Sequence, residues 1–235
     1  MKIILVGPGI LPIPPIGWGA IEILIADQAE MLKRLGYQVC IVNESNKKKA
    51  IDKIDSLKGD IVHFHYDEHI DWVKEINCNR IYITSHFGYL SKYSQNPKLF
   101  KNKLLFLLIK IIIKITPNTI CSLFGFNTKQ RNLIEYYSIF KKFLHTRAKV
   151  ICLSAEIENT YKKFHSKATL TVFHNGGRVD LIRFSNKAKN EKEAICVGKI
   201  EIRKNQANLQ SIQEIKFVGP IVDKRFKKNN PNYLG

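Results

Sequence analysis

The sequence predicts an α/β fold: a doubly wound, Rossmann-like parallel sheet, followed by the first strand, helix and strand of a second Rossmann-like domain. Three observations support this prediction. Short apolar runs such as residues 3–6 are typical of strands buried on both faces of a parallel sheet. These runs alternate along the chain with amphipathic segments of helical period. A strand, a glycine-rich loop, a helix and a second strand open the chain, and this order forms half of a mononucleotide-binding unit.

The glycine-rich loop after the first strand is the first candidate binding element. Gly7 and Gly9 end the strand, and Gly17-Trp18-Gly19 leads into a helix that we expect over residues 20–35. Backbone amides of such a loop, together with a helix N-terminus, favour a phosphate or another anion. The dinucleotide pattern G-x-G-x-x-G is broken, because Pro12 stands where its third glycine belongs. A dehydrogenase-like domain is therefore only a minor alternative.

Histidines stand at the ends of the third and fourth expected strands. Residues 60–65 form the third strand, in which a period of two places His63 and His65 on one face. His86 directly follows the fourth strand. Ligands of open α/β sheets gather at the carboxyl ends of strands, so we expect His86 in a binding site. For His63 and His65 we expect a hydrogen-bonded pair and no metal, because the sequence offers no further convergent ligand.

A very apolar segment with regularly spaced lysines covers residues 103–115. It is shorter than the ~20 residues that a membrane-spanning helix needs. In a helix, Lys103, Lys110 and Lys114 fall within about 40° of one another. Such a stripe suits either an interfacial helix on an anionic membrane surface or a core helix with one wet edge, and both interpretations stay open.

The other elements continue the alternation of strands and helices. We expect one complete domain over residues 1–185 and an incomplete second domain over residues 186–235. The remaining expected elements are a short helix within 47–59, helices over 128–145 and 155–164, strands over 38–42, 80–85 and 149–154, a strand that begins at residue 169, and a strand, short helix and strand between 193 and 219.

The composition narrows the classes of partner and compartment. The chain of 235 residues has a formal net charge of +18, and residues 101–235 hold 26 Lys and Arg against 9 Asp and Glu. The excess of positive charge in residues 101–235 favours binding to phosphorylated ligands, to an anionic membrane or to nucleic acid. The five cysteines are scattered, and Gly7 and the prolines interrupt the N-terminal apolar run before a secretory signal forms. Both features indicate reduced thiols and a cytoplasmic protein.

Four short stretches resemble the landmarks of a known family, in the same order. Residues 17–22 read Gly-Trp-Gly-Ala-Ile-Glu after a proline-bearing loop, and His86 follows the fourth strand. Asn175-Gly176 stands at the end of a later strand, and Lys199 and Lys204 follow the strand after that. These stretches resemble the family-4 retaining glycosyltransferases of the GT-B fold. Alanine replaces one glycine, the Asn-Gly segment is two residues longer, and lysine stands where the family usually has arginine.

The resemblance implies transfer of a sugar from a nucleotide-sugar to a glycan or lipid acceptor, with retention of configuration and with no metal at the diphosphate. The nucleotide-sugar is then a co-substrate, and no other cofactor is implied. Residue by residue, the resemblance implies that Gly17, Gly19 and Ala20 approach the donor, that Lys199 and Lys204 offset its diphosphate charge, that His86 is the catalytic residue, and that Glu22, His65 and Asn175 line the acceptor cleft.

The resemblance also defines two expected domains, an acceptor domain over residues 1–185 and an incomplete donor domain over residues 186–235. In the family the donor domain continues well over a hundred residues further. We therefore expect weak activity from this chain alone, or a separate chain that supplies the rest of the donor domain. The alternative function is a non-catalytic basic protein that docks on an anionic membrane or on nucleic acid. The expected location is the cytoplasm, with peripheral membrane attachment left open.

Overall fold

The computed structural model describes residues 1–86, 111, 128–164, 166–176 and 193–235. The chain divides into two compact units, Met1–Gly176 and Gly177–Gly235. The domain boundary expected after residue 185 lies outside the described residues. The same holds for the apolar segment 103–115 apart from Ile111, and so for its three lysines, Lys103, Lys110 and Lys114.

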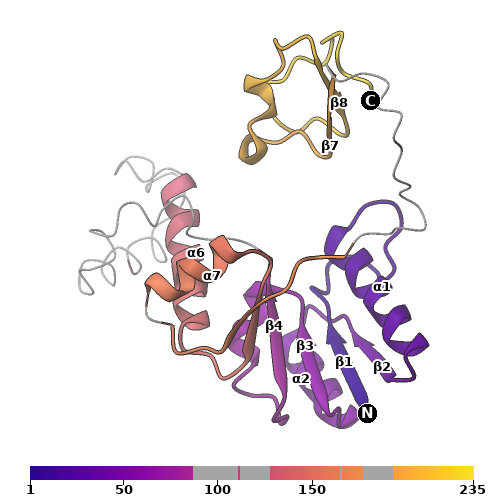
Figure 1. Cartoon of the computed structure of the whole chain (residues 1–235), viewed down its shortest axis with the longest axis vertical. Helices are drawn as coiled ribbons and strands as arrows, with labels where there is room; N and C mark the ends of the chain where they lie inside the picture. Colours follow the sequence, from indigo (N-terminus) through magenta and orange to yellow (C-terminus); the bar gives the residue numbers. More distant parts are fainter. Residues whose placement is uncertain (87–110, 112–127, 165, 177–192) are drawn as a thin grey trace. The chain divides into compact units, whose positions relative to one another are not determined.

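The first unit is built on one six-stranded, all-parallel sheet with the strand order β2-β1-β3-β4-β5-β6 (Figure 1). This order confirms a Rossmann-like α/β sheet, because β1 lies between β2 and β3 and the chain runs outward from β3 to β6. The strands are β1 (Lys2–Val6), β2 (Gln38–Val42), β3 (Ile61–Phe64), β4 (Ile81–Ser85), β5 (Lys149–Cys152) and β6 (Leu170–Val172).

Helices cover both faces of this sheet. Ile3 and Leu5 of β1 pack with the buried side of α1, and Ile4 and Val6 pack in a separate cluster with α2. Alternate residues of one strand point to opposite faces, so the all-apolar sequence of β1 reflects burial on both sides. The helices of this unit are α1 (Ala20–Arg34), α2 (Lys47–Leu57), the 3₁₀ helix η1 (Asp67–Trp72), α6 (Thr128–Phe143) and α7 (Ala155–Lys163).

Polar side chains and a glycine fix the helix ends. Asn46 and Ser154 cap α2 and α7, and each side chain accepts a hydrogen bond from the backbone amide three residues further on. Such a cap stabilises a helix by about 1 kcal/mol. Beyond α1, Gly36 adopts a left-handed φ of 84°, and its amide and that of Tyr37 satisfy carbonyls of the last turn. The sequence-based end of α1 at Gly36 is thereby confirmed.

The second unit is small and is held by one apolar cluster. Its strands β7 (Ala194–Val197) and β8 (Ile215–Val218) form a parallel pair. The predicted helix between them is wrong: two 3₁₀ turns, η2 (Ile202–Lys204) and η3 (Gln206–Asn208), take its place. Asn205 between them has a left-handed φ of 60°, which breaks an α-helix. The buried cluster consists of Ile200, Ala207, Phe217 and Phe226.

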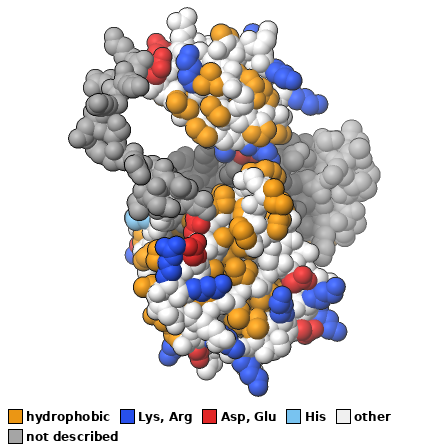
Figure 2. Space-filling view, turned by 90° about the vertical axis from the view of Figure 1, so that its right-hand side faces the viewer, with side chains coloured by type: hydrophobic (Ala, Val, Ile, Leu, Met, Phe, Trp, Pro, Cys, Tyr) orange, Lys and Arg blue, Asp and Glu red, His pale blue; other side chains and the backbone are white. Residues whose placement is uncertain are grey.

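Much apolar surface of the second unit remains exposed. Figure 2 shows hydrophobic side chains gathered on this unit with basic side chains at their margins. None of the described helices in either unit is long and apolar enough to cross a membrane. The exposed large hydrophobic residues of the described second unit are Ile195, Val197, Ile202, Leu209, Ile212, Val222 and Leu234.

Candidate functional site

The loop after β1 is held in place by Asn43, which directly follows β2. Its Oδ1 accepts a hydrogen bond of 2.7 Å from the amide of Gly9, and its Nδ2 donates one of 2.7 Å to the carbonyl of Leu11. Gly9 has a left-handed φ of 71°. A Cβ at this position would lie 2.2 Å from the backbone nitrogen of Ser45, so Gly9 is required for both conformation and space.

The predicted donor-binding turn leads directly into α1. Gly17 has a φ of 85° and open space around it, whereas a Cβ on Gly19 would lie 2.9 Å from Oε2 of Glu22. Ala20 is exposed at the first position of the helix. Glu22 is buried in the first helical turn, where the helix dipole favours a carboxylate. The turn therefore positions Glu22, but the expected contact of Gly17, Gly19 and Ala20 with a donor stays a prediction.

The carboxyl ends of β3 and β4 bring three histidines together. The strands are neighbours in parallel register, with His63 beside Tyr82. The ring centroids of His63 and His65 lie 4.0 Å apart, and those of His65 and His86 lie 6.0 Å apart. The shared face of His63 and His65 predicted by the period of two is thus confirmed. The expected mutual hydrogen bond is wrong, because His63 Nε2 pairs with the Thr84 hydroxyl at 2.8 Å.

Buried polar contacts hold the strand end that carries His86. The amide of His86 donates to Oδ2 of Asp67 at 3.2 Å. The preceding residue, Ser85, shares a hydrogen bond of 3.0 Å with the hydroxyl of Tyr161 in α7. Asp67, Ser85 and Tyr161 are all nearly inaccessible to solvent, so these contacts fix the exit of β4 from two sides.

A further buried histidine, His69, lies on η1, where its ring contacts Tyr66 and Trp72. The ring of His69 stacks on that of Trp72, with centroids 3.4 Å apart and an angle of 16° between the planes. His69 is 5% exposed. We use the name histidine cluster for His63, His65, His69 and His86, of which His63, His65 and His86 have neighbouring rings. The sequence did not indicate a role for Thr84, Tyr161 or Asn43. Their hydrogen-bond partners lie 21 to 76 residues away in the sequence, so local patterns carry no signal for these three residues.

Burial keeps the histidine cluster neutral. Loss of solvation lowers the pKa of His63 to about 3, with a smaller effect from His86. Burial also lowers the pKa of His69 and of His86 to about 4. Burial, His63 and His86 together hold the pKa of His65 well below its usual value. A neutral imidazole offers one donor and one acceptor, so at neutral pH the cluster is a hydrogen-bonding surface without charge.

Several ring nitrogens of this cluster are buried without a hydrogen-bond partner among the described residues. They are both nitrogens of His65, Nδ1 of His69 and Nε2 of His86. Buried polar atoms in folded proteins nearly always have a hydrogen-bond partner. We therefore expect these nitrogens to bind a hydroxyl group, an amide or a water molecule. Within the described part of the chain, no three His, Cys, Asp or Glu side chains are placed to hold a metal ion.

Two predicted acceptor residues have no hydrogen bond to this cluster among the described residues. Asn175 is exposed after β6, and Glu22 is buried in the first turn of α1. Between described residues, no hydrogen bond joins either side chain to a histidine of the cluster. Of the three acceptor residues, the structure therefore places only His65 beside His86, and the cleft itself stays a prediction.

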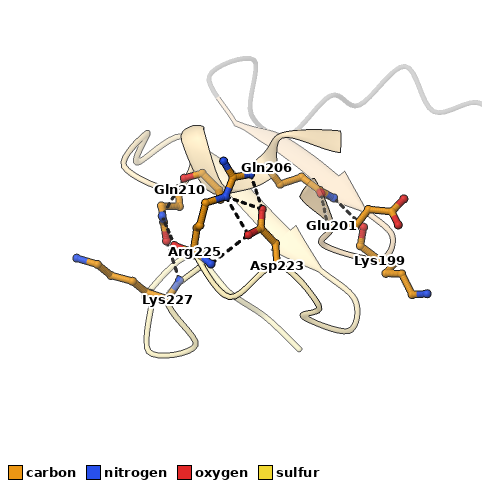
Figure 3. A network of polar contacts seen from close by, with 8 residues as sticks. Lys199, Glu201, Gln206, Gln210, Asp223, Arg225 and Lys227 are labelled. Carbon is orange, nitrogen blue, oxygen red and sulfur yellow. Dashed lines mark hydrogen bonds and ion pairs between the residues drawn. The ribbon is translucent and has the colours of Figure 1, made fainter. Parts of the chain in front are cut away.

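The two predicted diphosphate-binding lysines lie in the second unit. Lys199 and Lys204 are exposed, and a Cβ on Gly198 would lie 3.0 Å from Nζ of Lys204. The buried side chain of Gln206 donates to the carbonyl of Lys199 at 3.2 Å and accepts from the amide of Glu201 at 3.0 Å (Figure 3). Gln206 thereby fixes the backbone of residues 199–201, and the carbonyl of Glu201 accepts a hydrogen bond of 3.0 Å from the amide of Lys204.

Comparison of the chain with protein-family models finds no match, and none of the curated proteins matches it either.

Proposed function

We propose that this chain is a glycosyltransferase-like protein that transfers a sugar from a nucleotide-sugar donor to a glycan or lipid acceptor with retention of configuration. One observation carries the proposal: buried His65 and half-buried His86, both neutral, stand beside each other at the carboxyl ends of β3 and β4, with buried ring nitrogens that lack partners among the described residues. Carboxyl ends of parallel strands are where α/β proteins bind ligands. Uncharged donors and acceptors suit the hydroxyl groups of a sugar.

The reaction assigns separate roles to the two units. His86 orients the transferred sugar or the acceptor hydroxyl, and its amide contact with Asp67 limits its movement. The turn around Gly19 approaches the donor. Lys199 and Lys204 offset the negative charge that develops on the departing nucleoside diphosphate. The donor class and the retention of configuration rest on the resemblance of residues 17–22 and the later landmarks to family-4 glycosyltransferases.

Nucleotide release from a panel of nucleotide-sugars, with saccharide and lipid-linked acceptors supplied, tests the proposal. We expect slow turnover that His86→Asn lowers by about 100-fold, the usual size of an effect from a group acting in the transition state. The matched control is His145→Gln at an exposed histidine of the same unit, which should leave turnover unchanged. Turnover that survives His86→Asn contradicts the proposed role of this site. Binding of a nicotinamide dinucleotide without turnover of any nucleotide-sugar supports the dehydrogenase-like alternative.

A further inference from the structure

A cluster of exposed basic residues follows Asp223 in the second unit. We define the basic loop as residues 223–228, with the sequence Asp-Lys-Arg-Phe-Lys-Lys. Lys224, Arg225, Lys227 and Lys228 are exposed, and Phe226 between them is 4% exposed. One buried aromatic side chain thus anchors a loop that is otherwise basic.

The backbone of the basic loop is fixed by contacts on both sides. Phe226 packs against the ring of Phe217 with centroids 5.1 Å apart. The amide of Phe226 donates to the carbonyl of Asp223 at 3.0 Å, which closes a turn. Gln210 accepts from the amide of Lys227 at 2.8 Å and donates to the carbonyl of Arg225 at 3.1 Å (Figure 3). The lysines therefore project from an ordered backbone.

The four basic side chains differ in how their charge is compensated. The Arg225 guanidinium binds the buried Asp223 carboxylate through Nε and Nη2, at 3.0 and 2.7 Å, and this contact lowers the pKa of Asp223. Lys224, Lys227 and Lys228 form no ion pair with any other described residue. Lys227 extends away from the polar network in Figure 3. Arg225 thus has a structural role, and three lysine charges face solvent.

Exposed apolar side chains accompany these charges on the same small unit. Val222, directly before the basic loop, is 57% exposed, and Leu234 is 61% exposed. A surface that combines exposed apolar side chains with uncompensated lysines suits the interface of an anionic bilayer. Nucleic acid is the weaker candidate, because single strands stack on exposed aromatic rings. The aromatic residues of 193–235 are Phe217, Phe226 and Tyr233. The first two are buried and the third is half-buried, so these residues offer no fully exposed ring for stacking.

We infer that the basic loop, together with Val222, is a docking surface for an anionic lipid bilayer. Lys224, Lys227 and Lys228 bind the headgroups, and the neighbouring apolar side chain enters the interface. This inference does not depend on the glycosyl-transfer function proposed above.

Sedimentation of the full chain with phosphatidylcholine vesicles, with and without phosphatidylglycerol, tests this inference. We expect binding that requires the anionic lipid and weakens with added salt. Lys224→Gln, Lys227→Gln and Lys228→Gln combined should lower the partition coefficient about 100-fold, since each lysine near such a surface contributes about fivefold. The matched control removes the same charge from α2, through exposed Lys48, Lys49 and Lys53 to glutamine, and should retain most of the binding. Val222→Ser should weaken binding without changing its salt dependence.

Three outcomes overturn the inference. The first is equal sedimentation of the parent chain with neutral and anionic vesicles. The second is a decrease in the partition coefficient of the basic-loop variant that is no larger than the decrease in the α2 control variant. Such a result would show that net charge alone causes the effect. The third is displacement of the chain from vesicles by a single-stranded oligonucleotide whose phosphate concentration is lower than that of the anionic lipid, provided that the same lysines are required for oligonucleotide binding. Circular dichroism of both triple variants verifies that each remains folded.

Discussion

The hydroxyl of Thr84 lies 2.8 Å from Nε2 of His63, and this contact joins β4 to β3 beneath the histidine cluster. His63 in turn packs against His65, whose own ring nitrogens have no hydrogen-bond partner among described residues. The Thr84 hydroxyl can donate to this ring nitrogen or accept from it, so it satisfies Nε2 of His63 in either neutral tautomer. A residue of β4 thereby supports a buried histidine of β3.

Replacement of Thr84 by valine should destabilise the chain by about 1–3 kcal/mol, because it leaves a buried ring nitrogen of His63 without a partner while the side-chain shape is kept. Urea unfolding measures this change in free energy. Thr84→Ser keeps the hydroxyl and should recover most of the loss. A free energy of unfolding for Thr84→Val equal to that of the parent would contradict the role of Thr84.

The histidine cluster should make stability fall as the pH is lowered from about 6.5 to 4. Histidines of the unfolded chain bind protons near pH 6.5, whereas burial holds the pKa of His69 and of His86 at about 4. Acid therefore favours the unfolded state, by up to about 2 kcal/mol for each of these groups at pH 5. Thermal unfolding across this range measures the effect. His69→Gln should reduce the slope, and His145→Gln, at an exposed site, should not. A midpoint independent of pH would refute the prediction.

Two glycines of the N-terminal loop should respond differently to alanine. Both have a left-handed φ, 71° for Gly9 and 85° for Gly17, which costs an alanine about 1 kcal/mol. At Gly9 the added methyl group would also meet the Ser45 backbone nitrogen at 2.2 Å, whereas at Gly17 it would meet no atom within 4 Å. We therefore expect about 3 kcal/mol of destabilisation for Gly9→Ala and about 1 kcal/mol for Gly17→Ala. Similar values by urea unfolding would show that the loop can rearrange.

Local patterns in the sequence predict the sheet of the first unit and the position of its histidines. The continuous apolar run of β1 indicates burial on both faces, and helices α1 and α2 cover those faces. Period two predicts the shared side of His63 and His65, which the short distance between their rings confirms. These features depend on the alternation of side chains along one strand, so the residues of that strand suffice to predict them.

Contacts between distant segments are not predictable in this way. Ser85 and Tyr161 are separated by 76 residues, and Asn43 reaches Leu11 across 32. Such pairs depend on the order and register of strands, which local periodicity does not specify. The missing α-helix between β7 and β8 has a different reason. Asn205 adopts a left-handed conformation there, and asparagine is among the residues that accept it.

The last prediction concerns nucleotide-sugar binding at the second unit. Lys199 and Lys204 are exposed, so their attraction for a diphosphate is weakened by solvent, and lysine lacks the bidentate geometry of arginine. We therefore expect a dissociation constant in the millimolar range, roughly 4 kcal/mol of binding free energy. Isothermal titration calorimetry with the full chain should show that Lys204→Ala abolishes this binding, while Lys228→Ala, another exposed lysine of the same unit, leaves it unchanged. Micromolar affinity that persists in Lys204→Ala would place the donor site elsewhere on the chain.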